Sequence, residues 1–242
     1  MKRKDIVRLL GSLVCVGVIF FCGYKIGYKE YKNFQGEKLY DTLQDLEPEQ
    51  KVNNEKHLSE TEKLKAINSD YEAWINVPGT NISYPIARGN DNDYYLTHSF
   101  DKTDNFCGSI FMDYRNPKDL SEANTNSIIY GHNMLNDTMF AEMQDYKNKD
   151  FYEEHKTFTI TNTSNKKIPY DIVAVRLYVN GDYKPEFKWN NQEEFKQYVQ
   201  DMNDKSIYKI NCEITNEPIV TLYTCDYTKK GARLIVVGQR HN

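Results

Sequence analysis

Two apolar runs near the C-terminus constrain the fold more than any other part of this sequence. They cover residues 219–225 and 232–237, and β-branched and aromatic residues dominate both. Pro218 precedes the first run, and residues 228–231 supply turn chemistry between the two. The pattern predicts a β-hairpin with Cys225 at the end of one strand and an arginine, Arg233, in the neighbouring strand.

Composition agrees with a fold that is built mainly from strands. The 242 residues include 19 Tyr and 11 Phe but only 12 Gly, and such aromatic loading favours a β-rich core over a helical bundle. A chain of this length can hold one sizeable core and an appendage. Further strands are predicted at residues 71–86, on both sides of a Pro-Gly turn, and at 109–112, 127–130, 156–162 and 167–179.

A histidine at the end of one predicted strand is a candidate partner for Cys225. His132 follows a glycine directly after the run 127–130. A nucleophilic thiol needs an acid or base beside the sulfur, and that group is usually distant in sequence. Each residue also has a structural interpretation: a free cysteine is often a small buried hydrophobe, and a histidine can be purely structural. For Arg233 the structural alternative is an ion pair with Asp226 or with another surface acid.

Three short motifs, taken together, resemble those of the sortase family of cysteine transpeptidases. They are Thr-Leu-Tyr-Thr-Cys at residues 221–225, the arginine that follows it, and Tyr-Gly-His at residues 130–132. Thr-Leu-x-Thr-Cys with a downstream arginine is a specific signal, whereas Tyr-Gly-His alone is weak. Further segments are similar to the family, and the last of them most resembles class B: residues 70–80, 82–86, 92–96 and 108–115. The resemblance covers roughly residues 65 to 240.

The resemblance implies a mostly β fold. This is a closed sortase-type β-barrel of about eight strands, mostly antiparallel, with N-terminal helices and a helix inserted before the nucleophile strand. Closure is implied by the resemblance, and the strand-rich pattern supports it. The inserted helix fits the connection between residues 179 and 218, which is too long for a structureless loop. Residues 191–202 place four side chains of this connection on one helical stripe: Phe195, Tyr198, Val199 and Met202. The catalytic domain is expected to cover residues 65–242.

The resemblance also assigns roles to site residues. Cys225 attacks a peptide carbonyl as a thiolate, His132 protonates the departing amine, and Arg233 either stabilises the thiolate or donates to the oxyanion. With ordinary pKa values at pH 7, about 3% of thiols and about 25% of imidazoles are ionised, so the thiolate–imidazolium pair is on the order of 1%. The site must therefore stabilise that pair or work through a minority state. By motif position, four residues are candidates for the substrate groove: Asn92, Leu96, Tyr130 and Thr224.

The implied function is cell-wall sorting. Such an enzyme cleaves the C-terminal sorting signal of a surface protein after threonine, holds the acyl group as a thioester on Cys225, and transfers it to a peptidoglycan amine. The sorting signal is NPxTN-like or Pro-x-Thr-Gly. The implied partners are the surface protein and a peptidoglycan precursor or cell-wall amine, and no cofactor is implied. Two alternatives stay open: an exported cysteine protease without transfer, and an anchored binding module without catalysis.

An apolar run at the N-terminus predicts a membrane anchor within residues 1–26. Residues 9–24 carry no charge, and Arg8 and Lys25 can snorkel, so the usable length approaches the ~20 residues that a bilayer needs. No small-x-small site follows the run, which disfavours a cleaved signal peptide. The basic cluster at residues 2–4 predicts a single-pass protein of the cell membrane, with its N-terminus inside and its catalytic domain outside.

Between the anchor and the domain the sequence becomes polar. Residues 27–64 are expected to form a juxtamembrane spacer that is partly helical. Residues 60–67 favour a helix, which is a candidate to pack on the domain. Another short helix is predicted at residues 137–143, with Asn136 or Asp137 as its cap.

Charge and cysteine spacing argue against two classes of function. Beyond residue 26 the chain has 26 basic and 34 acidic residues, a net charge of −8, which disfavours nucleic-acid binding. The five cysteines form no CxxC pair and no metal-ligand spacing with histidine, which disfavours a zinc site. Cys107 and Cys212 are expected to be two buried thiols, with a disulfide between them as the alternative in an exported domain.

Overall fold

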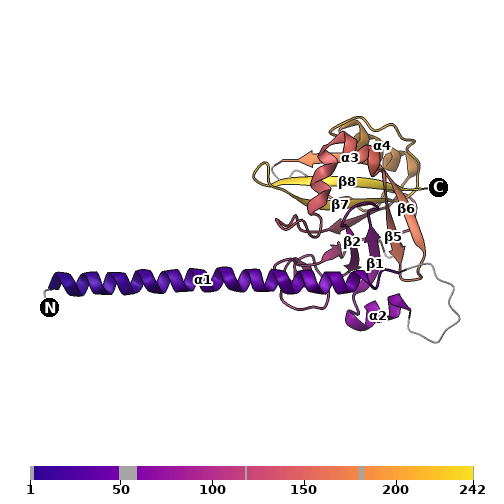
Figure 1. The fold of residues 1–242 in the computed structure, drawn as a ribbon. Coiled ribbons are helices and arrows are strands. Elements are labelled where there is room, and N and C mark those ends of the chain that lie inside the picture. Colours follow the sequence, from indigo (N-terminus) through magenta and orange to yellow (C-terminus); the bar gives the residue numbers. More distant parts are fainter. Residues whose placement is uncertain (1–2, 49–58, 118, 180–182, 242) are drawn as a thin grey trace.

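A closed β-barrel forms the body of the molecule, and a long N-terminal helix extends away from it (Figure 1). The computed structural model describes residues 3–48, 59–117, 119–179 and 183–241. Residues 1–2 of the expected cytoplasmic tip and residues 49–58 of the expected spacer lie outside the described residues.

Within the described residues the barrel has eight strands in the order β1-β2-β3-β4-β7-β8-β6-β5. The β2–β3 and β4–β7 pairs are parallel, and the other six pairs are antiparallel. The expected closed, mostly antiparallel barrel is confirmed. The strands are β1 (Tyr71–Asn76), β2 (Ser83–Ala87), β3 (Ile110–Met112), β4 (Asn126–Tyr130), β5 (Thr157–Asn162), β6 (Lys167–Tyr178), β7 (Ile219–Asp226) and β8 (Ala232–Arg240).

Helices flank the barrel, and two of them were predicted from the sequence. Ser59 caps the helix at residues 60–67 through a capping box with Glu62. Asn191 caps the inserted helix, where its side chain accepts from the backbone N–H of Glu194 at 2.9 Å. In the described part of the chain the α-helices are α1 (Arg3–Gln44), α2 (Glu60–Ile67), α3 (Lys149–Glu154) and α4 (Gln192–Asp204), and the 3₁₀ helices are η1 (Tyr94–Leu96) and η2 (Ala141–Lys147).

The helix predicted at residues 137–143 is wrong. Asp137 and Met139 both have φ values of 58°, a left-handed backbone conformation that interrupts a right-handed helix. The backbone N–H of Met139 instead donates to the hydroxyl of Tyr84 at 3.1 Å, which ties this segment to the barrel. Helical turns begin only at Ala141, in η2.

The neighbouring strands β7 and β8 are buried on both faces. Inside the barrel, Leu222 and Leu234 belong to the main core. On the outer face, Ile235 packs in a second cluster that includes Phe195 of α4. Alternate residues of a strand point to opposite faces, so Cys225 lies on the outer face, the one that α4 covers further along the strand.

The C-terminal part of α1 packs against the barrel. Tyr40 and Leu43 are buried, and the hydroxyl of Tyr40 donates to the carbonyl of Gly108 at 2.7 Å and accepts from the backbone N–H of Phe100 at 3.2 Å. Among the described residues, α1 is the one helix that is long and apolar enough to cross a membrane, and its residues 11–26 are exposed. The apolar part and the docked part belong to one uninterrupted helix (Figure 1).

All five cysteines are free thiols. Cys107 is buried as expected, but the expectation of a buried thiol is wrong for Cys212, which is exposed. Cys212 lies in the irregular segment between α4 and β7, where Asn203 Nδ2 contacts its sulfur at 3.5 Å. The alternative disulfide between Cys107 and Cys212 is therefore not formed.

Candidate active site

The parallel pairing of β4 and β7 brings the predicted histidine to the predicted cysteine. Tyr130 of β4 is the register partner of Tyr223 of β7, and the N–H of Gly131 donates to the carbonyl of Tyr223 at 3.2 Å. Parallel strands point the same way, so their C-terminal ends lie at the same edge of the sheet. His132 and Cys225 each lie two residues beyond this pair, and both line one groove.

The neighbouring strand β8 supplies the arginine. Arg233 stands directly opposite Cys225 in the antiparallel ladder, so both side chains lie on one face. Arg233 Nη1 donates to the carbonyl of Ala232 at 2.9 Å, and no carboxylate of the described residues pairs with this guanidinium. Asp226 is fully buried on the opposite face, where it pairs with Lys147 at 2.5 Å. The alternative of an Arg233–Asp226 ion pair is therefore wrong.

A groove of about 240 Å³ opens where these strand ends meet. All seven residues that were singled out from the sequence line this groove. Phe111, Gly131 and Tyr223 line it as well and were not predicted; Tyr223 lies two residues before Cys225, so the strand period places it on the same face. The lining residues are Asn92, Leu96, Phe111, Tyr130, Gly131, His132, Tyr223, Thr224, Cys225 and Arg233.

A backbone carbonyl orients the imidazole of His132. Its Nε2 atom lies 2.8 Å from the carbonyl oxygen of Leu96, at the end of η1. A carbonyl can only accept, so Nε2 carries the hydrogen, and in the neutral ring Nδ1 is then the unprotonated nitrogen. The backbone carbonyl of Leu96 thus fixes the tautomer of the neutral ring, and Nδ1 is left as the nitrogen that can accept a proton.

Gly108 makes room for this arrangement. Its φ is +59°, and a Cβ built there would lie 2.6 Å from the carbonyl oxygen of Tyr95, 2.9 Å from that of Leu96 and 3.1 Å from Cδ2 of His132. A side chain at this position would therefore push on the carbonyl that holds the imidazole.

Polar contacts also hold the end of β7. The hydroxyl of Thr224 donates to the carbonyl of Gly131 at 2.8 Å, and the residue is 1% exposed, so it shapes the groove without offering a free hydroxyl. The carbonyl of Cys225 accepts from Asn133 Nδ2 at 3.0 Å and from Gln144 Nε2 at 3.1 Å. Neither amide was predicted from the sequence. Both fix the backbone that carries the partly buried thiol.

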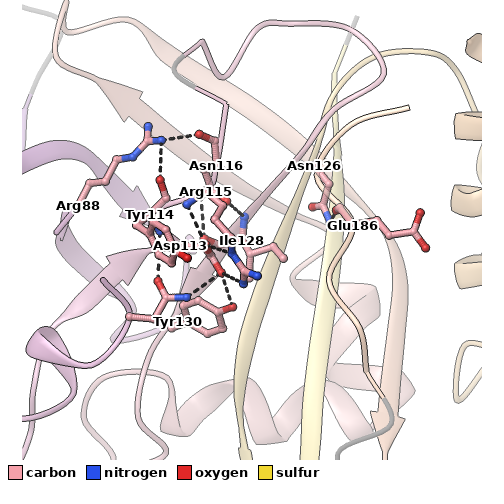
Figure 2. Close-up of polar contacts among 10 residues, drawn as sticks. Arg88, Asp113, Tyr114, Arg115, Asn116, Asn126, Ile128, Tyr130 and Glu186 are labelled. Atoms are coloured by element: carbon pink, nitrogen blue, oxygen red, sulfur yellow. Dashed lines mark hydrogen bonds and ion pairs between the residues drawn. The ribbon is translucent and has the colours of Figure 1, made fainter. Parts of the chain in front are cut away.

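One buried carboxylate, Asp113, organises the other end of the groove (Figure 2). Its Oδ2 accepts from Asn92 Nδ2 at 2.9 Å and from the hydroxyl of Tyr130 at 2.8 Å. Arg115 donates to the same carboxylate from Nε at 2.9 Å and from Nη2 at 2.7 Å. The polar groups of two residues expected to bind substrate are therefore turned towards Asp113, which the sequence analysis missed.

The charge of Asp113 is stabilised by these donors. Burial acts to raise the pKa of Asp113, but hydrogen bonds from Arg115, Tyr130 and Asn92 outweigh it and hold the pKa below its ordinary value. Burial and the neighbouring Asp113 carboxylate both raise the pKa of Tyr130, because both disfavour a phenolate. At neutral pH the cluster thus consists of a carboxylate, a guanidinium and a protonated phenol.

A thiol, an imidazole and a guanidinium line one groove at an end of the closed β-barrel, an arrangement that is typical of cysteine-dependent acyl-transfer enzymes. Comparison with known proteins agrees with this class. Residues 75–241 match the family model described as the sortase domain. The chain belongs to the sortase family, and it is a cysteine transpeptidase of the sortase B type.

The sequence match to one curated relative covers nearly the whole chain. Sortase B of Listeria monocytogenes is 34% identical over 247 residues, which span 99% of this chain and 98% of the relative. The X-ray structure of Clostridium perfringens sortase B is 38% identical, with a TM-score of 0.69, and the match covers 74% of this chain and 98% of that one. A Staphylococcus aureus sortase B–substrate complex is 29% identical, with a TM-score of 0.76 and coverage of 88% and 99%.

Proposed function

We propose that this chain cleaves a C-terminal sorting signal after threonine and transfers the surface protein to a peptidoglycan amine. The observation that carries the proposal is the meeting of Cys225, His132 and Arg233 in one groove. The sorting signal is NPxTN-like or Pro-x-Thr-Gly. The apolar positions of the signal can pack against the rings of Tyr130 and Tyr223. The centroids of these two rings are 5.1 Å apart.

In the first step the thiolate of Cys225 attacks the carbonyl carbon of threonine. The N–H groups of Arg233 donate to the oxyanion that forms. The tetrahedral intermediate collapses as the C–N bond breaks, and the imidazolium of His132 gives its Nδ1 proton to the departing amine. The products are a thioester on Cys225, a neutral imidazole and the released peptide.

In the second step an amine attacks the thioester carbon. His132 accepts the proton that the amine loses, and the thiolate of Cys225 departs as the new amide forms. One amide is exchanged for another, so neither an oxidant nor a reductant is consumed. Support for the two substrate classes comes from relatives: one S. aureus structure is a sortase B–substrate complex, and another sortase B structure contains triglycine.

The proposed location is the cell membrane, with the N-terminus inside and the catalytic domain outside. The apolar helix α1 supports the membrane attachment. Residues 1–26 form the tip and anchor in this proposal, residues 27–64 the connecting segment, and residues 65–242 the catalytic domain.

The test uses the full chain in detergent micelles with quenched peptides that carry either signal. Cleavage after threonine should appear with wild type and vanish in Cys225→Ala, and an amide product should form when an amine is added. Hydrolysis that never yields an amide product would favour a protease. Binding of the peptides without cleavage would favour a non-catalytic module.

A further inference from the structure

An exposed tyrosine close to the nucleophile bonds back to the segment that carries the histidine. Tyr227 lies two residues beyond Cys225, at the start of the turn between β7 and β8, and is 65% exposed. Its hydroxyl donates to the backbone carbonyl of Asn133 at 2.9 Å, a hydrogen bond that we call the Tyr227 contact. Partial burial and the nearby Cys225 raise the pKa of Tyr227 against the opposing effect of Arg233. At neutral pH the phenol therefore keeps the proton that it donates.

Asn133 joins the histidine segment to the nucleophile. It follows His132 directly, and its Nδ2 donates to the carbonyl of Cys225 at 3.0 Å. Gln144 Nε2 donates to the same carbonyl at 3.1 Å, from η2. Asn133 thus accepts the Tyr227 contact on its backbone and donates to Cys225 from its side chain. The two hydrogen bonds close a ring of contacts around the end of β7.

This ring lies where the strand ladder has ended. The last register pair between β4 and β7 joins Tyr130 to Tyr223, two residues before the catalytic histidine and cysteine. Hydrogen bonds from the side chains of Thr224, Asn133 and Tyr227 connect the two segments beyond that pair. Thr224 is buried and Tyr227 is exposed, so the Tyr227 contact is the outermost of these connections. Side-chain contacts therefore take over from strand pairing at the point where the reacting groups lie.

Acylation depends on the separation that these contacts set. The thiolate of Cys225 must reach the carbonyl carbon of threonine while His132 faces the departing nitrogen. A misplacement of about 1 Å can cost about a hundredfold in rate. Neither Tyr227 nor Asn133 is among the residues that line the groove. Their loss is therefore expected to change the rate of acylation and not the binding of the peptide.

We propose that Tyr227 is a positioning residue for the nucleophile and that it acts through Asn133. The Tyr227 contact fixes the peptide unit of Asn133, and the Asn133 amide holds the carbonyl of Cys225 and with it the direction of the thiol. In this role Tyr227 touches neither the substrate nor the sulfur. The inference rests on the proposed acylation of Cys225 and adds the residue that keeps the thiol aligned with His132.

The experiment measures single-turnover acylation and steady-state KM for the full chain in detergent micelles, with the quenched peptides that carry either sorting signal. Tyr227→Phe removes only the hydroxyl. Tyr208→Phe is the matched control, because its hydroxyl also donates to a backbone carbonyl, that of Tyr146, at 2.7 Å and outside the groove. Tyr227→Phe should slow acylation about fivefold to twentyfold, while KM stays within about twofold of wild type. Tyr208→Phe should leave both values at the wild-type level.

Two further measurements separate positioning from other roles. Alkylation of Cys225 by iodoacetamide needs no aligned carbonyl, so its rate in Tyr227→Phe should stay within about twofold of wild type. Asn133→Ala removes the amide but keeps the backbone carbonyl, and it should slow acylation about tenfold to a hundredfold. Adding Tyr227→Phe to Asn133→Ala should slow acylation by less than about twofold more, because the two residues act in series.

Four outcomes would overturn the inference while leaving the proposed function intact. Equal acylation rates in Tyr227→Phe and wild type would show that the Tyr227 contact positions nothing. A higher KM at an unchanged rate would make Tyr227 a substrate-binding residue, and alkylation slowed in step with acylation would assign an effect on the reactivity of the thiol. Fold-changes that multiply in the double variant would show that Tyr227 does not act through Asn133. Wild type that forms no thioester with any peptide would overturn the proposed function and this inference together.

Discussion

Cys225 on β7 and Arg233 on β8 are direct partners across an antiparallel ladder. Opposed residues in such a ladder have Cβ atoms about 4.5–5.5 Å apart and share a face of the sheet. The spacing between the Cβ atoms of Cys225 and Arg233 is therefore set by strand pairing and not by a loop. Asp226, the acid next along β7, cannot compete for the guanidinium because it points to the opposite face.

Replacing Arg233 with lysine should lower kcat about 10²–10³-fold, because an ammonium does not reproduce the planar, multiply donating guanidinium at the oxyanion. The pH dependence of Cys225 alkylation then separates the two roles. A profile that moves to higher pH in Arg233→Lys would assign thiolate stabilisation, and an unchanged profile beside a reduced kcat would assign the oxyanion. Wild-type kcat in the variant would contradict both.

Gly108→Ala should impair catalysis through the imidazole. The left-handed backbone alone costs about 1–2 kcal/mol for a residue with a Cβ, and the new carbon would press on the Leu96 carbonyl and on His132. A displacement of this kind can lower kcat by about tenfold to a hundredfold. The matched control is Gly89→Ala, where the added carbon meets neighbours no closer than 3.4 Å. Equal activity of the two variants, measured by single-turnover acylation, would show that the Leu96 contact does not position the imidazole.

Asp113→Asn should weaken binding of the sorting peptide. The substitution keeps the side-chain volume but removes the charge that Arg115, Tyr130 and Asn92 share. We expect a KM for the peptide that is higher by about threefold to tenfold, and a loss of about 1.5–3 kcal/mol in the free energy of unfolding. Asp119→Asn, on an exposed turn capped by its own contacts with Ser121, is the control. A lower kcat at unchanged KM would contradict a role in shaping the groove.

The Lys147–Asp226 pair should make stability depend on pH in the acid range. Burial acts to raise the pKa of Asp226, but hydrogen bonds from Lys147 and Thr228 outweigh it and hold the pKa below its ordinary value. The pair therefore stabilises the fold above the unfolded pKa of about 3.9, and this contribution is lost as the pH falls through the folded pKa. Urea unfolding should show wild type to be about 1.5–3 kcal/mol more stable than Asp226→Asn at neutral pH. The gap should begin to narrow below about pH 4 and close as the pH falls through the folded pKa, and a gap that stays constant over this range would contradict the assignment.

Local patterns were enough to predict the hairpin that carries Cys225 and Arg233, because a short turn joins two strands whose residue types favour extended backbone. The position of His132 beside them depends on the parallel pairing of β4 with β7, two segments far apart along the chain. The alternation of residues along a strand does not show which other strand it pairs with. The combination of motifs was therefore what linked His132 to Cys225 and Arg233. The geometry brings all seven candidate residues to one groove, while their individual roles stay predictions.

Other features depend on contacts that no local pattern contains. The importance of Asp113 arises because Asn92 and Tyr130, from separate segments, turn towards it. The helix predicted from residue 137 begins only at Ala141, because the backbone is left-handed at Asp137 and Met139, where the N–H of Met139 bonds to the hydroxyl of Tyr84. In both cases tertiary contacts outweigh local preference.

A rigid connection differs from a flexible tether in the volume that it lets an enzyme search. The contact of Tyr40 with the barrel lies in the same continuous helix as the exposed apolar residues that end near Ile26. At about 1.5 Å per residue, the barrel is held roughly 20 Å from the end of that apolar stretch. With α1 embedded in a bilayer, the Cys225 thiol could rotate about the helix axis at a constant height above the membrane. It would not move through the depth of the cell wall. Under the proposed membrane attachment, acceptors much farther from the bilayer than this height would stay out of the enzyme's reach.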